Sequence, residues 1–331
     1  MKIIQFMASA GFGGAEKVFL ELSNGLAERH DVTALVVRNC RYRSMFSPRV
    51  TIVELQSNPT SNNPLLHFEL YKVIKREQPD IIHSHAAKGS MLVHRVNRFL
   101  GIPHLGTKHN DRKGRIFNRL KWVSAVSHKG CRSVESTGHG TVKVIFNGVQ
   151  AEETGEPQKS DTFSMLAVGR LDKIKGFDIL IRQVAQLDFP FLLQIVGEGP
   201  EEDSLRKLID ELGLKGKVLL PGFRKDIPQL MHNSDVVILS SHREGCPKVL
   251  LESFFYAPLV LATRVGDVPE LLPQELQTSC ETMAADISRI QSGYEDARKV
   301  FEAIREERKA TFSFDAVVAE YERYYKDILS A

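Results

Sequence analysis

The sequence predicts an α/β protein with two doubly wound domains, each built around a mostly parallel β-sheet. Short apolar runs alternate with amphipathic segments along most of the 331 residues, and this alternation is typical of strands joined by helical crossovers. The length suits two domains of about 150 residues each. We therefore expect a first domain at residues 1–150, a second at residues 161–310, and between them a linker at residues 151–160, where Glu, Gly, Pro, Gln and Lys predominate.

Each expected element follows from hydrophobic periodicity and from the Gly and Pro residues that interrupt it. In the first domain we expect strands at residues 2–7, 31–38, 50–54, 80–83, 103–108, 122–126 and 143–146, and helices at residues 15–30 and 65–77. In the second domain we expect strands at residues 163–168, 191–196, 218–220, 236–239 and 259–262, and helices from residue 176 and at residues 201–212, 227–231 and 247–256. Two further helices, at residues 282–309 and 313–329, would end the chain.

The composition is that of an ordinary globular protein. Hydrophobic residues make up 42% of the chain, and its four cysteines include no Cys-x-x-Cys pair, which argues against a disulfide framework and a zinc site and favours a reducing cytoplasm. The first ten residues mimic a secretory signal, but their apolar run is short and contains Gln5, so we expect a strand there. No stretch approaches the ~18 apolar residues of a spanning helix.

The two halves of the sequence carry charges of opposite sign. Residues 1–150 contain 22 Lys and Arg against 10 Asp and Glu, a formal charge of +12, whereas residues 151–331 contain 22 against 31, a charge of −9. Many basic residues lie between Lys108 and Arg132, interleaved with aromatic ones. Such a stretch can lie on an anionic membrane, attract nucleic acid, or form a solvated helix face. As a membrane or acceptor surface we single out Arg112, Lys113, Arg115 and Arg119.

Two glutamates eight positions apart, Glu244 and Glu252, lie where a predicted strand gives way to a predicted helix. The free backbone N–H groups at the start of that helix favour an anionic diphosphate. Carboxylates beside a diphosphate are tolerated when they face hydroxyl groups, so a sugar nucleotide is a sensible ligand. The alternative is a pair of solvated acids near a helix N-terminus, which the helix dipole favours. The residues that would line the helix start are Cys246, Pro247, Lys248 and Val249.

The segments around these glutamates resemble the retaining glycosyltransferases of family 4, which have the GT-B fold. The E-x7-E element follows the strand DVVIL and precedes APLVLAT and VGDVPE. Four further segments agree in the same order, namely GFGGAE at residues 11–16, VIFNGV at 144–149, VGRLDKIKG at 168–176 and IVGEGP at 195–200. The resemblance spans residues 1 to about 275. It implies two Rossmann-like domains facing a central cleft, and a last helix, residues 311–331, that packs back on the first domain.

The resemblance also implies roles for charged residues of the second domain. Arg170 and Lys175 match the cations that bind the diphosphate in the family, and preorganised cations stabilise the charge that develops on a departing diphosphate. Glu244 would hold sugar hydroxyls near the anomeric carbon, and Glu252 would hold the ribose hydroxyls. Because no Asp-x-Asp motif is present, we expect no metal and no other cofactor.

Three more residues of the second domain are candidates for the donor site. Gly169 precedes the first of the two cations, and Glu198 and Phe223 are expected near the base of the nucleotide. Phe223 would act by packing, although a core phenylalanine explains it almost as well.

In the first domain, a glycine loop and a histidine are candidates. Counted from residue 11, the dinucleotide motif G-x-G-x-x-G fails at its third glycine, which is Glu16, but Gly13 and Gly14 still allow backbone to approach a ligand closely. The resemblance places this loop against the donor or acceptor, with a plain tight turn as the alternative. His109 matches a position where the family often places a histidine against the donor sugar.

Other histidines lie near that position in the predicted fold. His83 and His85 end a neighbouring strand, and three clustered imidazoles can suggest zinc. No acidic or thiol residue close in sequence completes such a site, and structural histidines are the alternative.

The resemblance therefore implies a retaining glycosyltransferase that acts by front-face displacement. It would move a hexosyl or N-acetylhexosaminyl group from a nucleotide-diphosphate sugar, with a UDP-sugar favoured, to a glycan or lipid-linked acceptor in bacterial surface polysaccharide or lipopolysaccharide synthesis. Because many acceptors in the family are lipid-linked, we favour a cytoplasmic protein that is peripheral at the inner face of the cytoplasmic membrane, and we expect no nucleic acid. A nucleotide-sugar epimerase of the same fold and a non-catalytic nucleotide-sugar-binding protein are the alternatives.

Overall fold

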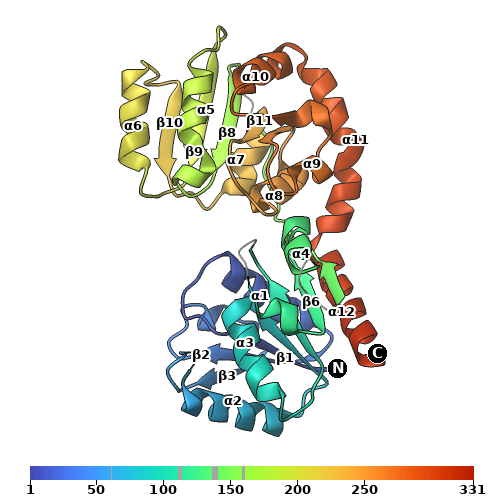
Figure 1. Cartoon of the computed structure of the whole chain (residues 1–331). Coiled ribbons are helices and arrows are strands. Elements are labelled where there is room, and N and C mark those ends of the chain that lie inside the picture. Colours follow the sequence, from blue (N-terminus) through green and yellow to red (C-terminus); the bar gives the residue numbers. More distant parts are fainter. Residues whose placement is uncertain (61, 111–113, 136–140, 159–160) are drawn as a thin grey trace. The chain divides into compact units, whose positions relative to one another are not determined.

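The chain forms two compact units in a computed structural model that describes residues 1–60, 62–110, 114–135, 141–158 and 161–331 (Figure 1). Unit 1 comprises Met1–Gly148 and Phe314–Ala331, and unit 2 comprises Val149–Ser313. Each unit contains one sheet covered by helices. The described strand pairs of both sheets are parallel, which confirms the predicted architecture of two Rossmann-like domains.

Unit 1 contains a seven-stranded sheet in the order β3-β2-β1-β4-β5-β6-β7. The order reverses between β1 and β4, and in doubly wound sheets ligands bind at the carboxyl ends of the strands at such a switch point. Its strands are β1 (Lys2–Met7), β2 (Asp31–Val37), β3 (Thr51–Leu55), β4 (Ile81–His85), β5 (His104–Lys108), β6 (Trp122–Ala125) and β7 (Thr141–Val144). Its helices are α1 (Gly14–Leu26), α2 (Pro64–Glu77), α3 (Ala86–Asn97), α4 (His128–Glu135) and α12 (Phe314–Ser330).

The last helix, α12, contributes to the core of unit 1. Tyr321, Tyr324 and Tyr325 are buried there among side chains of the sheet and α1. The Tyr324 hydroxyl donates to the carbonyl of Val123 over 3.2 Å, and Glu322 pairs with Arg29 and His30 of the segment after α1. The last helix is therefore bonded to residues that lie about 200 or more positions earlier in the chain.

Unit 2 contains a six-stranded sheet in the order β10-β9-β8-β11-β12-β13. Here the order reverses between β8 and β11. Its strands are β8 (Phe163–Val168), β9 (Phe191–Val196), β10 (Val218–Gly222), β11 (Val236–Leu239), β12 (Val260–Thr263) and β13 (Gln277–Thr278). Its helices are α5 (Phe177–Val184), α6 (Glu202–Glu211), α7 (Ile227–Asn233), α8 (Lys248–Tyr256), α9 (Val268–Leu271), α10 (Met283–Ser292) and α11 (Tyr294–Phe312).

Two segments differ from the sequence prediction. The helix expected at residues 282–309 is two helices, because Gly293 leaves the helical conformation between α10 and α11. Residues of the expected linker hydrogen-bond to side chains of unit 2: the backbone N–H groups of Glu152 and Gly155 donate to Tyr256 and Gln229, each over 2.7 Å. These linker residues are therefore part of unit 2.

Candidate active site

A lysine and a glutamate meet at the switch point of unit 2. Lys175 ends a short 3₁₀ turn after β8, and Glu244 lies in the loop after β11. The Lys175 Nζ lies 2.6 Å from Glu244 Oε1, and the two side chains are 24% and 16% exposed. The sequence predicted both as site residues, but it did not predict that they form an ion pair.

Local hydrogen bonds hold this pair in place. The Asp172 side chain accepts from the backbone N–H of Ile174 and so caps the turn that carries Lys175. The Ser240 hydroxyl donates to the Lys175 carbonyl over 2.8 Å, and the Ser241 hydroxyl donates to Glu244 Oε1 over 2.7 Å. Both charged groups are therefore positioned before any ligand arrives, which is what electrostatic catalysis requires.

A glycine allows the turn to approach β11. Gly176 follows Lys175 with a φ of 63°, a left-handed conformation that favours glycine. A side chain at this position would also collide with the carbonyl of Ser240. The glycine in the motif therefore has a local structural cause, which is the close contact between the ends of β8 and β11.

The N-terminus of α8 lies directly after the Glu244 loop. No side chain in the described part of the chain caps this helix, and the first-turn N–H groups of Leu250 and Leu251 bond back to the carbonyl of Pro247. The N–H groups of Lys248 and Val249 precede them at the positive end of the helix dipole, an arrangement that favours a phosphate group.

A backbone hydrogen bond holds the loop before α8, and the cysteine of this loop is protonated. The backbone N–H of Asp267 donates to the carbonyl of Gly245 over 2.9 Å. Burial, with further contributions from the nearby carboxylates of Asp267 and Glu244, raises the pKa of the Cys246 thiol well above its ordinary value. Cys246 is therefore a neutral thiol at physiological pH and not a thiolate nucleophile.

The other predicted donor residues of unit 2 lie at the carboxyl ends of adjacent strands. Arg170 follows Gly169 at the end of β8 and is exposed, and Glu198 is exposed after β9. Phe223, after β10, is 63% exposed, so the interpretation as a core phenylalanine is wrong. Glu252 lies one turn into α8, where its Oε1 is 3.8 Å from the Lys248 Nζ.

In unit 1, histidines occupy the corresponding switch point between β1 and β4. His85 ends β4, and its ring nitrogens bond Gln5 Oε1 over 2.7 Å and His109 Nε2 over 3.1 Å. The two nitrogens of His83 bond the hydroxyls of Tyr325 and Thr107. Hydrogen bonds therefore engage both nitrogens of His83 and of His85, and the absence of a metal at these residues stays a prediction.

The glycine loop of unit 1 opens α1. Gly13 and Gly14 are exposed at the start of the helix. The Glu16 side chain accepts from the N–H of Gly13 over 3.1 Å, so a carboxylate occupies the place that a pyrophosphate takes in dinucleotide-binding loops. The structure therefore agrees with the prediction that this loop does not have the form of a dinucleotide-binding loop.

The predicted basic surface is described in part. Arg115 and Arg119 are exposed, whereas Arg112 and Lys113 lie outside the described residues. None of the helices that the structure describes is both long and apolar enough to cross a bilayer.

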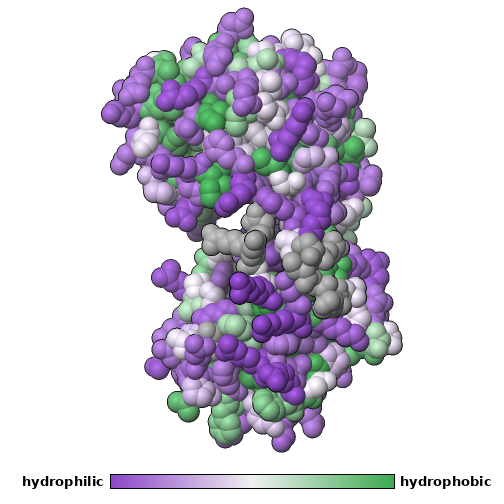
Figure 2. All heavy atoms as spheres, viewed as in Figure 1, coloured by the Kyte–Doolittle hydropathy of each residue, from purple (hydrophilic) through white to green (hydrophobic). Residues whose placement is uncertain are grey.

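A second surface of unit 1 was missed in the sequence. Leu65 and Phe68 of α2 are 68% and 57% exposed, and Phe99, after α3, is 80% exposed. The Lys72 Nζ lies 4.4 Å from the centre of the Phe68 ring, and Figure 2 shows hydrophobic side chains at the edge of unit 1 where α2 lies in Figure 1. The sequence does contain a sign of this surface. On α2, apolar residues occur both at buried positions, such as Leu66, and at exposed positions, such as Leu65.

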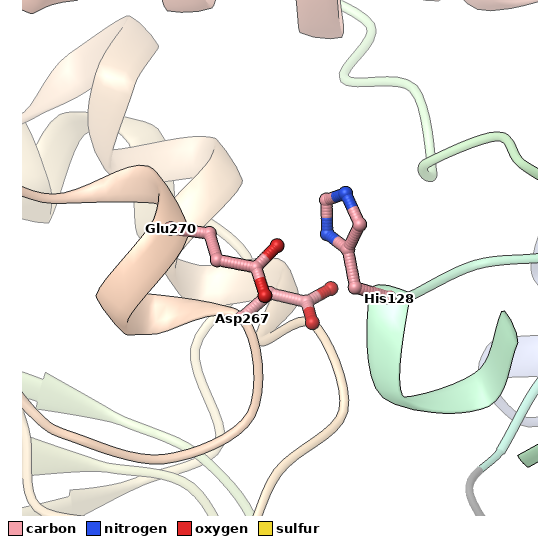
Figure 3. A group of neighbouring side chains, drawn as sticks. All are labelled: His128, Asp267 and Glu270. Atoms are coloured by element: carbon pink, nitrogen blue, oxygen red, sulfur yellow. The ribbon is translucent and has the colours of Figure 1, made fainter. Parts of the chain in front are cut away.

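Three further titratable residues are shown in Figure 3. Asp267 and Glu270 lie at the start of α9 in unit 2, Asp267 buried and Glu270 exposed, and His128 begins α4 in unit 1. The two carboxylates of unit 2 do not by themselves make a cation site, since two ligands from one short helix leave most of a coordination sphere unfilled.

Comparison with known protein families decides the class. The family described as Glycosyltransferase Family 4 matches residues 12–153, and the family described as Glycosyl transferases group 1 matches residues 149–305. The chain belongs to glycosyltransferase family 4. It is thus a glycosyltransferase with the GT-B fold, as predicted, and the epimerase and non-catalytic alternatives are not supported.

Individual relatives and solved structures agree with this assignment. The chain is 29% identical over 263 residues to the lipopolysaccharide core biosynthesis glycosyltransferase LpsE of Rhizobium meliloti, covering 76% of each protein. It is 27% identical to the gpi3 component of the phosphatidylinositol N-acetylglucosaminyltransferase of Schizosaccharomyces pombe, covering 78% of this chain and 63% of that protein. The crystal structure of Anabaena Alr3699/HepE in complex with UDP has a similar fold, with a TM-score of 0.85 at 20% identity over 99% of this chain and 100% of that one.

Proposed function

We propose that this glycosyltransferase moves a hexosyl or N-acetylhexosaminyl group, with retention of configuration, from a UDP-sugar to a glycan or lipid-linked acceptor in the synthesis of lipopolysaccharide or another bacterial surface polysaccharide. The observation that carries the proposal is the 2.6 Å pair of Lys175 and Glu244 at the switch point of unit 2. In this pair, Lys175 is the cation that would bind a diphosphate, and Glu244 is the carboxylate that would bind sugar hydroxyls. Both lie near the N-terminus of α8.

The pair supports catalysis by charge stabilisation. As the bond between the anomeric carbon and the diphosphate breaks, negative charge grows on the departing phosphate, and Lys175, Arg170 and the first N–H groups of α8 oppose it. Glu244 Oε1 accepts from Lys175 and Ser241. Its second oxygen has no hydrogen-bond partner among the described residues, so it can accept from a sugar hydroxyl.

Retention follows from the order of bond changes. The acceptor hydroxyl approaches the anomeric carbon on the face that the diphosphate leaves, and its proton passes to a phosphate oxygen as the new C–O bond forms. This route needs no second carboxylate as a nucleophile, unlike the paired acids of retaining hydrolases. It also needs no metal, because two cations and a helix N-terminus already oppose the diphosphate charge.

The relatives support the choice of substrates. The structural neighbour HepE has been solved in complex with UDP and in complex with UDP-glucose, which favours a UDP-sugar as donor here. Two relatives, named for lipopolysaccharide core biosynthesis and for phosphatidylinositol, favour a glycan or lipid-linked acceptor.

A lipid-linked acceptor requires unit 1 to work at a membrane surface. Arg115 and Arg119, with Arg112 and Lys113, would attract an anionic leaflet at about 1 kcal/mol per residue near the surface. The exposed Phe68 and Phe99 would add apolar contacts within the headgroup region. We therefore propose a cytoplasmic enzyme that binds the inner face of the cytoplasmic membrane peripherally and does not bind nucleic acid.

The test is a transfer assay with UDP-glucose, UDP-galactose and UDP-N-acetylglucosamine, with and without a lipid-linked saccharide acceptor. We expect acceptor-dependent release of UDP from one of these donors, and a product whose anomeric configuration, read by NMR, matches the donor. Inversion of configuration would contradict the mechanism. A change of the donor sugar without release of UDP would contradict glycosyl transfer itself.

A further inference from the structure

A continuous chain of hydrogen bonds runs through the core of unit 1 and ends at His109. Gln5 of β1 and His85 of β4 are fully buried, and His109 follows β5 and is partly exposed. The rings of His85 and His109 are stacked, with their centres 5.2 Å apart. This series of hydrogen bonds therefore connects the interior of the sheet to His109, whose side chain is partly exposed and can be reached by a ligand.

The direction of this series of hydrogen bonds follows from the orientation of the Gln5 amide in the structure. The Gln5 amide nitrogen donates to the Tyr325 hydroxyl over 3.0 Å, which leaves the amide oxygen toward His85 Nε2 at 2.7 Å. A carbonyl oxygen cannot donate, so His85 Nε2 must carry a proton. A neutral imidazole has only one N–H, so His85 Nδ1 holds a lone pair, and His109 Nε2 must donate to it.

The far side of the chain is consistent with this direction. The Tyr325 hydroxyl accepts from Gln5 and uses its own hydrogen to bond His83 Nδ1 over 2.6 Å. His83 Nε2 then donates to the Thr107 hydroxyl, which bonds the Ser124 hydroxyl. The Gln5 amide nitrogen also lies 3.3 Å from His83 Nδ1, which fits an Nδ1 that accepts. The series therefore runs from β6 through α12 and β1 to His109 without a clash of two donors or two acceptors.

His83 and His85 are neutral, as the tautomer argument requires. Burial lowers the pKa of His83 and His85 well below the ordinary value, and the neighbouring histidines lower it further. Burial lowers the pKa of His109 to about 4. All three are uncharged at neutral pH.

We propose that His85 is a positioning residue that holds His109 as the Nε2–H tautomer, so that Nδ1 of His109 presents a lone pair to a sugar hydroxyl. Among the described residues of unit 1, Nδ1 of His109 has no hydrogen-bond partner. His109 therefore acts as an acceptor and not as an acid or a cation. This inference rests on the proposed function for the identity of the ligand, but the tautomer itself is a property of the free protein.

The junction after His85 supports a site and not a plain core. Ala86, the next residue, has a φ of 60° although it is not glycine. Such left-handed residues are strained when they carry a side chain, and strained residues gather at functional sites. The His85 ring itself is held by its hydrogen bonds to Gln5 and His109 and by stacking against His83 and His109.

The direct test is ¹⁵N NMR of the imidazole nitrogens in the free, full-length protein. We expect His109 Nε2 to be protonated and Nδ1 unprotonated in the wild type. In His85→Phe, which keeps a stacked ring but removes both nitrogens, and in Gln5→Met, which removes only the amide acceptor, we expect both tautomers of His109. The Nδ1–H tautomer in the wild type, or an unchanged tautomer in both variants, would overturn the proposal.

His104→Phe is the matched control. His104 is a buried histidine of the neighbouring strand β5, but it bonds the Ser84 hydroxyl over 2.7 Å and is outside the chain that ends at His109. We expect His104→Phe to leave the tautomer of His109 unchanged, while altering the core by the same kind of substitution as His85→Phe.

Transfer assays with the three UDP-sugars then separate the two proposals. We expect His85→Phe and Gln5→Met to lower kcat/KM about 10-fold, the size of one lost hydrogen bond, and His104→Phe to leave it within about 2-fold. If the variants contain both tautomers of His109 but kcat/KM is unchanged, then the tautomer does not matter for transfer, and that part of the proposal is wrong. Absence of transfer in the wild type, with the Nε2–H tautomer present, would instead count against the proposed function.

Discussion

Units 1 and 2 share a doubly wound topology but carry different chemistry at their switch points. In unit 2, the ends of β8 and β11 bring together a lysine and a glutamate as an ion pair. In unit 1, the ends of β1 and β4 bring together an amide and imidazoles, which are neutral at physiological pH. The difference fits the two tasks that we propose for the units, because a departing diphosphate needs opposing charge, whereas hydroxyl groups are recognised by directed hydrogen bonds.

The largest expected effect concerns the charges of unit 2. Lys175→Ala and Arg170→Ala should each lower kcat by about 10² or more, because the lost cation acts mainly on charge that develops in the transition state. Steady-state kinetics of UDP release would measure this. Lys173→Ala is the matched control, since Lys173 is an exposed lysine of the same short turn. Near wild-type turnover in Lys175→Ala would show that the pair is only structural.

The second prediction concerns the buried, neutral histidines of unit 1. Burial lowers the pKa of His83 and His85, that of His104 to about 3 and that of His109 to about 4, whereas unfolded histidines titrate near 6.5. Below that pH the unfolded state binds more protons, so the free energy of unfolding of unit 1 should fall as pH decreases from about 6.5 to 4. Each histidine contributes up to about 1.4 kcal/mol per pH unit.

Urea titrations at several pH values would measure this loss of stability. Trp122, the single tryptophan of the chain, lies in β6 of unit 1, so its fluorescence reports on that unit. His104→Phe removes one of the titrating groups and should reduce the pH dependence. A stability of unit 1 that does not change between pH 7 and pH 5 would mean that these histidines are not buried as neutral groups.

A third prediction separates donor binding in unit 2 from membrane contact in unit 1. The protein should bind vesicles that contain anionic lipid and dissociate as salt rises, because screening acts over about 8 Å at physiological ionic strength. Neutralising Arg112, Lys113, Arg115 and Arg119 together should weaken this binding and slow transfer to a membrane acceptor, with little change in affinity for UDP. Equal cosedimentation with neutral and anionic vesicles would leave these residues as a solvated face.

The exposed apolar side chains of α2 and of the segment after α3 can be tested in the same vesicle experiment. Phe68→Ser with Phe99→Ser should weaken vesicle binding without changing its salt dependence, because these side chains would contribute apolar contacts and no charge. Vesicle binding that is unaffected by the two substitutions would assign the membrane contact to the basic residues alone.

The smallest effect is expected from a chelator. If Lys175, Arg170 and the N-terminus of α8 together oppose the diphosphate charge, then EDTA should leave the rate of UDP release unchanged. Loss of activity that Mg²⁺ or Mn²⁺ restores would mean that a metal shares this role, and the interpretation of unit 2 would have to change.

Much of the fold follows from local patterns in the sequence. The strands β8, β9 and β11 have the predicted bounds, because each is an apolar run that ends in small or polar residues. The break at Gly293 was missed, since a single glycine inside a helical pattern is often tolerated. The strand β13, of two residues, is too short to give a periodic signal.

The candidate site was predictable as a set of residues but not as an arrangement. Arg170, Lys175 and Glu244 were recognised by their motifs, yet the ion pair joins residues 69 positions apart, and no local pattern encodes that contact. In the sequence, Gln5 argues only against a secretory signal, whereas in the structure it bonds His85 and also Tyr325, 320 positions away. Such contacts depend on which strands become neighbours, and topology decides that.

The most direct test of the central claim is hydrogen–deuterium exchange with and without UDP. If the switch point of unit 2 binds the diphosphate, UDP should slow exchange at residues 169–176 and at the first turn of α8, and Lys175→Ala should weaken that protection far more than Lys173→Ala. Protection confined to other strands of unit 2, or equal protection in the two variants, would contradict the assignment of the Lys175 and Glu244 pair to the donor diphosphate.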